Sequence, residues 1–142
     1  MNTILAFSKT HFLKLFVILS VIIVGCESSQ KKEIDEINTK MMKLHDEVMP
    51  QTMKIGDLRD KVLKSALDAD TAKKSEAARV ANALQLAEDG MYQWMEKYGN
   101  TINNIKDEKQ KLEVYKQLYV DIDKTKKETI LSMKAADIFL KK

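Results

Sequence analysis

The sequence is poor in the residues that interrupt and crosslink folded chains. Its 142 residues include one cysteine, one proline and four glycines, and aromatic residues make up only 6%. So few prolines and glycines leave few turn signals. No segment shows the alternation of apolar and polar residues that is typical of half-buried strands. Alanine, glutamate, lysine, leucine and methionine, all good helix formers, dominate instead. The composition therefore predicts an all-α fold.

Neither sign of charge is in large excess. The chain has 24 basic and 21 acidic residues, and two of the lysines, Lys9 and Lys14, fall in the targeting segment described below. The rest of the chain is therefore nearly neutral. A nearly neutral chain gives no reason to expect a nucleic-acid partner, and we predict none.

Side chains that commonly catalyse reactions are also scarce. After residue 25, His45 is the only histidine. No Ser–His–Asp or Cys–His set can be assembled beyond it, and no glycine-rich phosphate loop occurs. Carboxylate pairs such as Asp46-Glu47 are adjacent, and adjacent side chains on a helix point about 100° apart. The sequence therefore predicts a protein that is not an enzyme and carries no cofactor.

Residues 1–25 have the parts of a secretory signal peptide. Lys9 and Lys14 form a basic region, and the uncharged segment Leu15–Val24 follows. Ten such residues are too few to cross a bilayer core, which needs about 20 residues in a helix. An uncleaved N-terminal anchor is the alternative, but Lys14 interrupts the apolar stretch that it would need. We therefore predict that the segment is removed.

The signal ends in Ile23-Val24-Gly25-Cys26, which resembles the lipobox of bacterial lipoproteins. In such proteins the cysteine is diacylated, becomes the new N-terminus and is acylated again, so Cys26 is the predicted lipid attachment site. Three acyl chains, of the palmitate type, hold a protein on a membrane far more firmly than one chain does. Glu27 is not the aspartate associated with retention in the inner membrane, and residues 27–32 form no clear acidic export cluster. These features favour the periplasmic face of the outer membrane. The predicted domains are a signal peptide at 1–25, a lipidated tether at 26–30 and a helical bundle at 31–142.

The first predicted helix begins near Lys31 and carries a heptad seam. The seam residues are Ile34, Ile37, Met41, Leu44, Val48, Ile55, Leu58 and Val62. Pro50 lacks the N–H that would bond to Asp46, yet the seven-residue spacing persists across it. We therefore predict a kinked but continuous helix, with residues 50–56 as its softest part.

A turn is predicted at residues 67–71, where Asp68, Asp70 and Thr71 can each cap a helix N-terminus. The second helix then has a regular seam. It comprises Ala77, Val80, Leu84, Ala87, Met91, Trp94 and Tyr98. Gly90 lies within the helix and suggests a close approach of another helix. Gly99 is the predicted helix stop.

The third predicted helix runs from about residue 105 to Leu140. Asn104 and Asp107 resemble a capping box at its start. Its predicted seam is Leu112, Tyr115, Tyr119, Ile122, Thr129, Met133, Ala136 and Leu140, with Lys126 making the middle polar. Three long helices joined by short turns predict an up-down-up, three-helix, coiled-coil-like bundle.

Three blocks of sequence resemble a known family. They are the Cys-terminated signal, the pair of segments 44–50 and 53–58 (LHDEVMP and MKIGDL), and residues 87–95 (AEDGMYQWM). The chain is similar to small lipoproteins of Bacteroidota-type bacteria, a family catalogued as "viral A-type inclusion protein". Gly90 departs from the alanine that is frequent at this position in the family. Because the family has no established activity, the resemblance implies the fold and export but no chemistry.

A row of soft ligands supplies the one metal-binding hypothesis. Met41, Met42 and Met49 lie three or four residues from His45, so on a helix all three thioethers can approach the imidazole. Thioethers and imidazole suit Cu(I) or Ag(I), and Met53 extends the row. The competing interpretation is that these methionines fill the core and that His45 pairs with a carboxylate.

These observations favour a non-catalytic structural or adaptor module, anchored by lipid to the outer membrane. The predicted partners are the membrane itself and either another envelope protein or a second copy of the chain. Heptads require a partner helix but do not determine which chain supplies it. Soft-metal buffering by Met42, His45 and Met49 is the alternative function.

Overall fold

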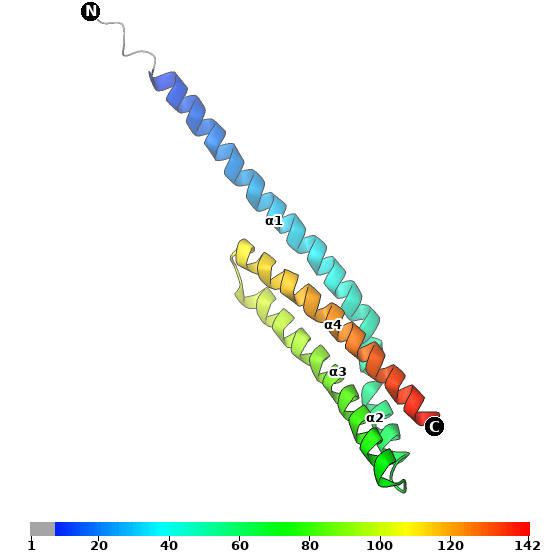
Figure 1. Cartoon of the computed structure of the whole chain (residues 1–142). Helices are drawn as coiled ribbons and strands as arrows, with labels where there is room; N and C mark the ends of the chain where they lie inside the picture. The colour runs from blue at the N-terminus through cyan, green and yellow to red at the C-terminus, as the bar shows by residue number, and fades with distance from the viewer. Residues whose placement is uncertain (1–7) are drawn as a thin grey trace, which may run out of the picture.

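The computed structural model describes the backbone of residues 8–142 and the side chains of residues 29–142. Within these residues the chain forms four helices: α1 (Ser8–Thr52), α2 (Ile55–Lys64), α3 (Thr71–Asn104) and α4 (Glu108–Leu140). α1 and α2 run in one direction, α3 returns, and α4 repeats the first direction (Figure 1). α4 packs against both α1 and α3, whereas α2 packs mainly against α3. The predicted all-α, up-down-up bundle is therefore confirmed, with α1 and α2 together forming its first arm.

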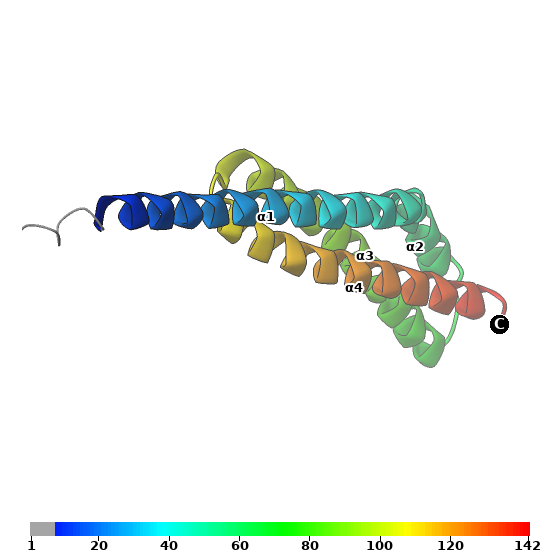
Figure 2. The ribbon, with the colours of Figure 1, turned by 90° about the horizontal axis from the view of Figure 1, so that it is seen from above.

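α1 begins at Ser8, well before the start near Lys31 that the seam predicts. Its N-terminal part extends beyond the turn between α3 and α4 (Figures 1 and 2). The side chains of the predicted signal peptide and of Cys26 lie outside the described residues. Among the residues that are described, no helix combines the length and the apolar character that crossing a membrane requires.

The first arm breaks at Met53-Lys54, so the prediction of one continuous kinked helix is wrong. Pro50 is accommodated inside α1, and the Lys54 N–H then bonds to the Gln51 carbonyl at 3.0 Å in a tighter turn. Pro50 has no N–H to bond to the Asp46 carbonyl, and the tighter turn begins directly after this weakened step of the helix. The heptad phase nevertheless continues, since Met41, Val48, Ile55 and Val62 are all fully buried.

The predicted turn between the first and second arms is confirmed. Residues 65–70 leave the helical path, and α3 begins at Thr71. Asp70 is the N-cap, because its carboxylate accepts a hydrogen bond from the Lys73 N–H at 2.8 Å. This bond satisfies one of the free N–H groups at the start of the helix.

The second turn lies later than predicted. α3 continues through Gly99 to Asn104, and no described glycine has a positive φ. Thr101 is buried on the same seam, with its hydroxyl bonded to the Lys97 carbonyl at 2.8 Å, so the helix still packs beyond Gly99. The cap of α4 is Asp107, which accepts from the Gln110 N–H at 2.7 Å, and not Asn104.

The buried face of α4 also differs from the prediction in its register. Tyr119 and Leu140 are exposed and Met133 is only half-buried. The buried residues are Leu112, Tyr115, Leu118, Ile122, Thr125, Thr129, Ser132, Ala136 and Phe139. α4 has a second row of apolar residues beside this seam, and only the positions of α1 and α3 decide which row is covered.

The interior is divided into two apolar cores by a polar layer. The aromatic core joins α1 to α3 and α4 around Met41, Met91, Trp94 and Tyr115. The alanine core joins α2 to the other ends of α3 and α4 and contains Ala66, Ala77, Ala81, Ala87 and Ala136. Between them lies a polar waist, whose buried members are Thr52, Thr125, Thr129 and Ser132.

Candidate functional site

Cys26 is the predicted lipid attachment residue, and its side chain lies outside the described part of the chain. The α1 backbone is helical at this position and through the predicted tether at 26–30. The structure therefore leaves the lipid attachment as a prediction.

The predicted soft-metal row does not form one continuous site. Met41 is fully buried in the aromatic core, and Met53 is 72% exposed in the turn that follows α1. Met42 and Met49 are half-buried against the aromatic core. His45 lies between them along the helix, with its side chain 20% exposed. The structure therefore reduces the candidate set to Met42, His45 and Met49.

The His45 ring is held by one contact with its face and one with a ring nitrogen. It stacks on Trp94, with ring centroids 5.8 Å apart, and its Nδ1 lies 3.0 Å from the Asp46 carboxylate. The predicted pairing of His45 with a carboxylate is thus confirmed. A hydrogen bond at Nδ1 leaves the other ring nitrogen as the available ligand atom, the arrangement that metal-binding histidines commonly use.

The aromatic residues next to His45 connect all three arms of the bundle. Trp94 stacks on Tyr98 at 5.2 Å and donates from Nε1 to the Leu118 carbonyl at 2.8 Å. Tyr98 donates to the Asn38 side chain at 2.6 Å. Burial raises the pKa of Tyr115, and the nearby Tyr98 and Asp35 raise it further. The bonds from Trp94 to Leu118 of α4 and from Tyr98 to Asn38 of α1 fix the relative positions of the helices, because each links α3 to a defined partner on another helix.

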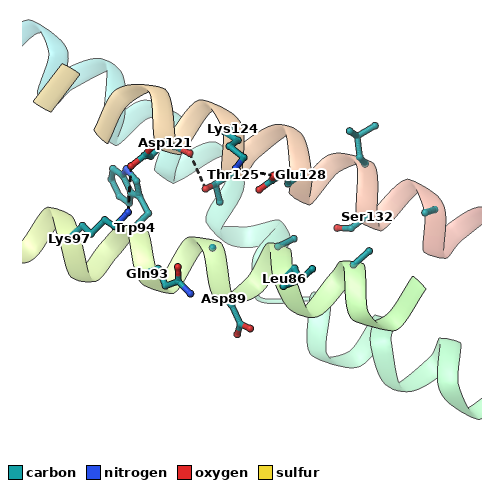
Figure 3. A pocket seen from close by; sticks show the side chains of 15 residues that line it. Leu86, Asp89, Gln93, Trp94, Lys97, Asp121, Lys124, Thr125, Glu128 and Ser132 are labelled. Carbon is teal, nitrogen blue, oxygen red and sulfur yellow. Dashed lines mark hydrogen bonds and ion pairs between the residues drawn. The ribbon is translucent and has the colours of Figure 1, made fainter. Parts of the chain in front are cut away.

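A groove of about 650 Å³ runs between α3 and α4. Figure 3 shows its two walls, with Thr125 directed from α4 toward α3. Gly90 and Thr125 form the floor at mid-length, where a Cβ at residue 90 would lie 3.8 Å from the Thr125 hydroxyl oxygen. This contact distance agrees with the close approach that Gly90 suggested, and it leaves room for alanine. We call this feature the α3–α4 groove.

The walls of the α3–α4 groove carry exposed leucines and ion pairs. Leu86 is 62% exposed and Leu131 is 65% exposed. Lys97 pairs with Asp121 across the groove, with 3.7 Å between nitrogen and oxygen, and Lys124 pairs with Glu128 along α4. Sequence reasoning missed this groove. The one available signal was the succession of small residues Ala83, Ala87 and Gly90 beside an apolar Leu86.

Ion pairs between helices set the electrostatics of the other faces. Lys126 of α4 pairs with Glu47 of α1 and holds the pKa of that carboxyl below its usual value. Glu33 of α1 lies 3.2 Å from Lys116 and raises the pKa of that lysine. Within the described residues, no group of three or more histidine, cysteine, aspartate or glutamate side chains is arranged to hold a metal ion.

Comparison with known proteins finds no match: no family model covers the chain, and no curated protein or solved structure is similar to it. The resemblance to small lipoproteins therefore stays a prediction. Function has to be argued from the groove, from the Met42–His45–Met49 row and from the N-terminal sequence.

Proposed function

We propose that this protein is an outer-membrane lipoprotein, anchored through Cys26, that acts as a non-catalytic structural or adaptor module of the cell envelope. The lipobox-like N-terminus and the resemblance to small Bacteroidota-type lipoproteins support the anchor. The observation that carries the adaptor role is the α3–α4 groove with exposed leucines on its walls.

The groove suits a helical partner. Small residues on its floor allow a helix backbone to approach closely, while Leu86 and Leu131 offer apolar side chains that a partner would cover. Burying a leucine side chain contributes about 2 kcal/mol relative to leaving it in water. Because the two walls belong to long helices held by both cores, the surface is largely preformed and a partner would bind without reordering it.

Crosslinking in the native envelope tests the adaptor role. A tagged full-length chain is crosslinked in cells, purified through the tag, and its attached peptides are identified by mass spectrometry. We expect crosslinks that map to lysines on the walls of the groove, such as Lys97 and Lys124, and that fall sharply in a Leu86→Ser, Leu131→Ser variant. Leu67→Ser is the matched control, because Leu67 is 67% exposed but lies in the first turn. Crosslinks spread evenly over all faces would contradict the adaptor role of this groove.

The anchor has a separate test. Cys26→Ser removes the acceptor of the lipid, so the protein should leave the membrane fraction and keep the mobility of the uncleaved precursor. If the variant stays membrane-bound with the mobility of the native protein, the lipid is not the anchor.

Soft-metal binding is the second candidate, favoured by the held geometry of His45. A ring oriented by Asp46 and Trp94 loses little freedom on binding Cu(I) or Ag(I), and Met42 and Met49 lie within a helical turn of it. Titration of the full-length protein in detergent with Ag(I) should then show one saturable site that is lost in His45→Ala. Met53→Ala is the matched control. Binding that is absent, or equal in both variants, removes this function.

A further inference from the structure

Contacts across the α3–α4 groove fix where residues of the two helices lie along its length. We call this position the height of a residue. Gly90 lies opposite Thr125, and Lys97 pairs with Asp121. At 1.5 Å of rise per residue, Leu86 and Leu131 then lie within about 3 Å of the same height. The groove therefore has an apolar level at Leu86 and Leu131 and, toward the α3–α4 turn, a charged level at Lys97 and Asp121.

This layout is self-complementary when a second copy lies parallel to the first. A two-fold axis along the bundle places α3 of one copy against α4 of the other and keeps every residue at its own height. Leu86 then faces the partner copy's Leu131, and Lys97 faces the partner copy's Asp121. The apolar levels of the two copies therefore meet each other, and so do the charged levels, on both sides of the axis.

An antiparallel pair centred on the middle of the groove does not achieve this match. Turning the second copy end over end about the middle of the groove sets α3 against α3, with its heights inverted. The apolar level at Leu86 would then meet the charged level at Lys97, which leaves a lysine partly desolvated beside a leucine. The parallel arrangement also leaves both N-termini at the same end, as two chains anchored in one membrane require.

We propose that the occupant of the α3–α4 groove is a second copy of this chain, bound in parallel to form a four-helix interface of two α3 and two α4 helices. The inference rests on the proposed function in one respect, because it names the partner of the surface to which the adaptor role is assigned. The choice of a parallel pair also draws on the predicted anchor, whereas the match of the apolar and charged levels does not.

Disulfide trapping between two differently tagged full-length copies tests the arrangement. One copy carries Leu86→Cys and the other carries Leu131→Cys, and both are produced together and oxidised in the native membrane. We expect a disulfide-linked pair that carries both tags. Leu86→Cys in both copies should crosslink at least about fivefold less, since the two α3 helices lie diagonally in a four-helix arrangement. Leu67→Cys paired with Leu131→Cys is the control of matched exposure and should give only background.

The outcomes separate the inference from the proposed function. Strong linkage through Leu86→Cys in both copies would overturn the parallel arrangement. Background linkage in every combination would overturn self-association, and the adaptor role would still stand if mass spectrometry found a foreign protein on the groove. Loss of membrane attachment in Cys26→Ser bears on the anchor alone.

Charge reversal tests the Lys97 level without cysteines. A copy with Lys97→Glu is produced together with a differently tagged copy carrying Asp121→Lys. Each change breaks the pair within its own chain, but only the mixed dimer restores opposite charges across the interface. We expect mixed dimers to exceed the statistical one half and to outnumber either same-variant dimer about three- to tenfold, whereas random pairing gives twofold, because an exposed ion pair contributes about 0.2–1 kcal/mol. A statistical mixture would mean that Lys97 and Asp121 do not meet between copies.

Discussion

The two cores of this bundle use different packing chemistry. The aromatic core is built from large side chains whose polar atoms reach specific partners, as in the bonds of Trp94 to the Leu118 carbonyl and of Tyr98 to Asn38. The alanine core contains five alanines and no hydrogen-bonded aromatic residue among its described members. Large side chains bury more area and bond to named partners, whereas alanines let helices approach closely with little burial per residue. The difference indicates that the aromatic core sets the register of the bundle and that the alanine core mainly sets the helix spacing.

Truncating the central side chain of each core should cause the largest losses in the free energy of unfolding. Comparing the two losses should show which core contributes more to stability. We expect Trp94→Ala to lower the free energy of unfolding by about 4 kcal/mol, because it leaves a cavity and removes the bond to Leu118. Leu84→Ala in the alanine core should cost about 3 kcal/mol. Urea unfolding of the full-length protein in detergent, followed by circular dichroism, measures both. Equal losses for the two variants would contradict the assignment of register to the aromatic core.

The polar waist should yield a gain in stability at one position. The Thr129 hydroxyl is buried and has no hydrogen-bond partner among the described residues, whereas the Thr125 hydroxyl bonds to the Asp121 carbonyl at 3.0 Å. Thr129→Val keeps the shape and removes an unsatisfied group, so it should raise the free energy of unfolding by about 1 kcal/mol. Thr125→Val, the matched control, should give no gain. A loss of stability in Thr129→Val would mean that a buried water satisfies the hydroxyl.

The helix caps test whether the two ends of the molecule differ locally. Asp70 caps α3 at the end of the alanine core, and Asp107 caps α4 at the end of the aromatic core. Each replacement by alanine should cost about 1 kcal/mol, because each frees one N–H group. Hydrogen exchange should show faster opening confined to the first turn of the affected helix. Exchange that spreads along the helix only in Asp70→Ala would show that the alanine core holds its helices less firmly.

The smallest expected effect is the pH dependence of the ion pairs between helices. The bond from Lys126, reinforced by its charge, lowers the pKa of Glu47 in the folded protein from its ordinary 4.5. A lowered pKa contributes stability that is present above the unfolded value and is lost as pH falls through the folded one. Lys142 lowers the pKa of Glu76 beside the alanine core in the same way.

Unfolding midpoints measured between pH 6 and pH 3 should therefore fall less steeply in Glu47→Gln and in Glu76→Gln than in the native protein. The two variants report on the aromatic and alanine ends respectively. Unchanged slopes in both would show that these surface pairs do not contribute to stability.

Much of the fold could be predicted from local patterns. The heptad spacing of Met41, Val48, Ile55 and Val62 is correct even though the helix breaks between Val48 and Ile55, because a short helical turn preserves the phase. The cap at Asp70 was among three predicted candidates. The stop at Gly99 was wrong, because Gly99 does not adopt the left-handed conformation of a helix stop and Thr101 beyond it still packs in the interior.

The candidate site was less predictable than the fold. His45, Met42 and Met49 could be singled out from their spacing, but the stacking of His45 on Trp94 joins residues far apart in the sequence. The α3–α4 groove depends on which faces α1 and α2 leave uncovered, and no periodicity in α3 or α4 alone contains that information.

The sequence by itself determined that the chain is helical, where its first turn lies and which residues of α3 face the interior, since these follow from propensity, capping and a single apolar stripe. Only the tertiary structure decided the buried face of α4, the length of α3 and the existence of the groove. α4 offers two neighbouring apolar rows, and the choice between them depends on where α1 and α3 lie. That choice buries Leu118 and Phe139 and leaves Tyr119 and Leu131 exposed.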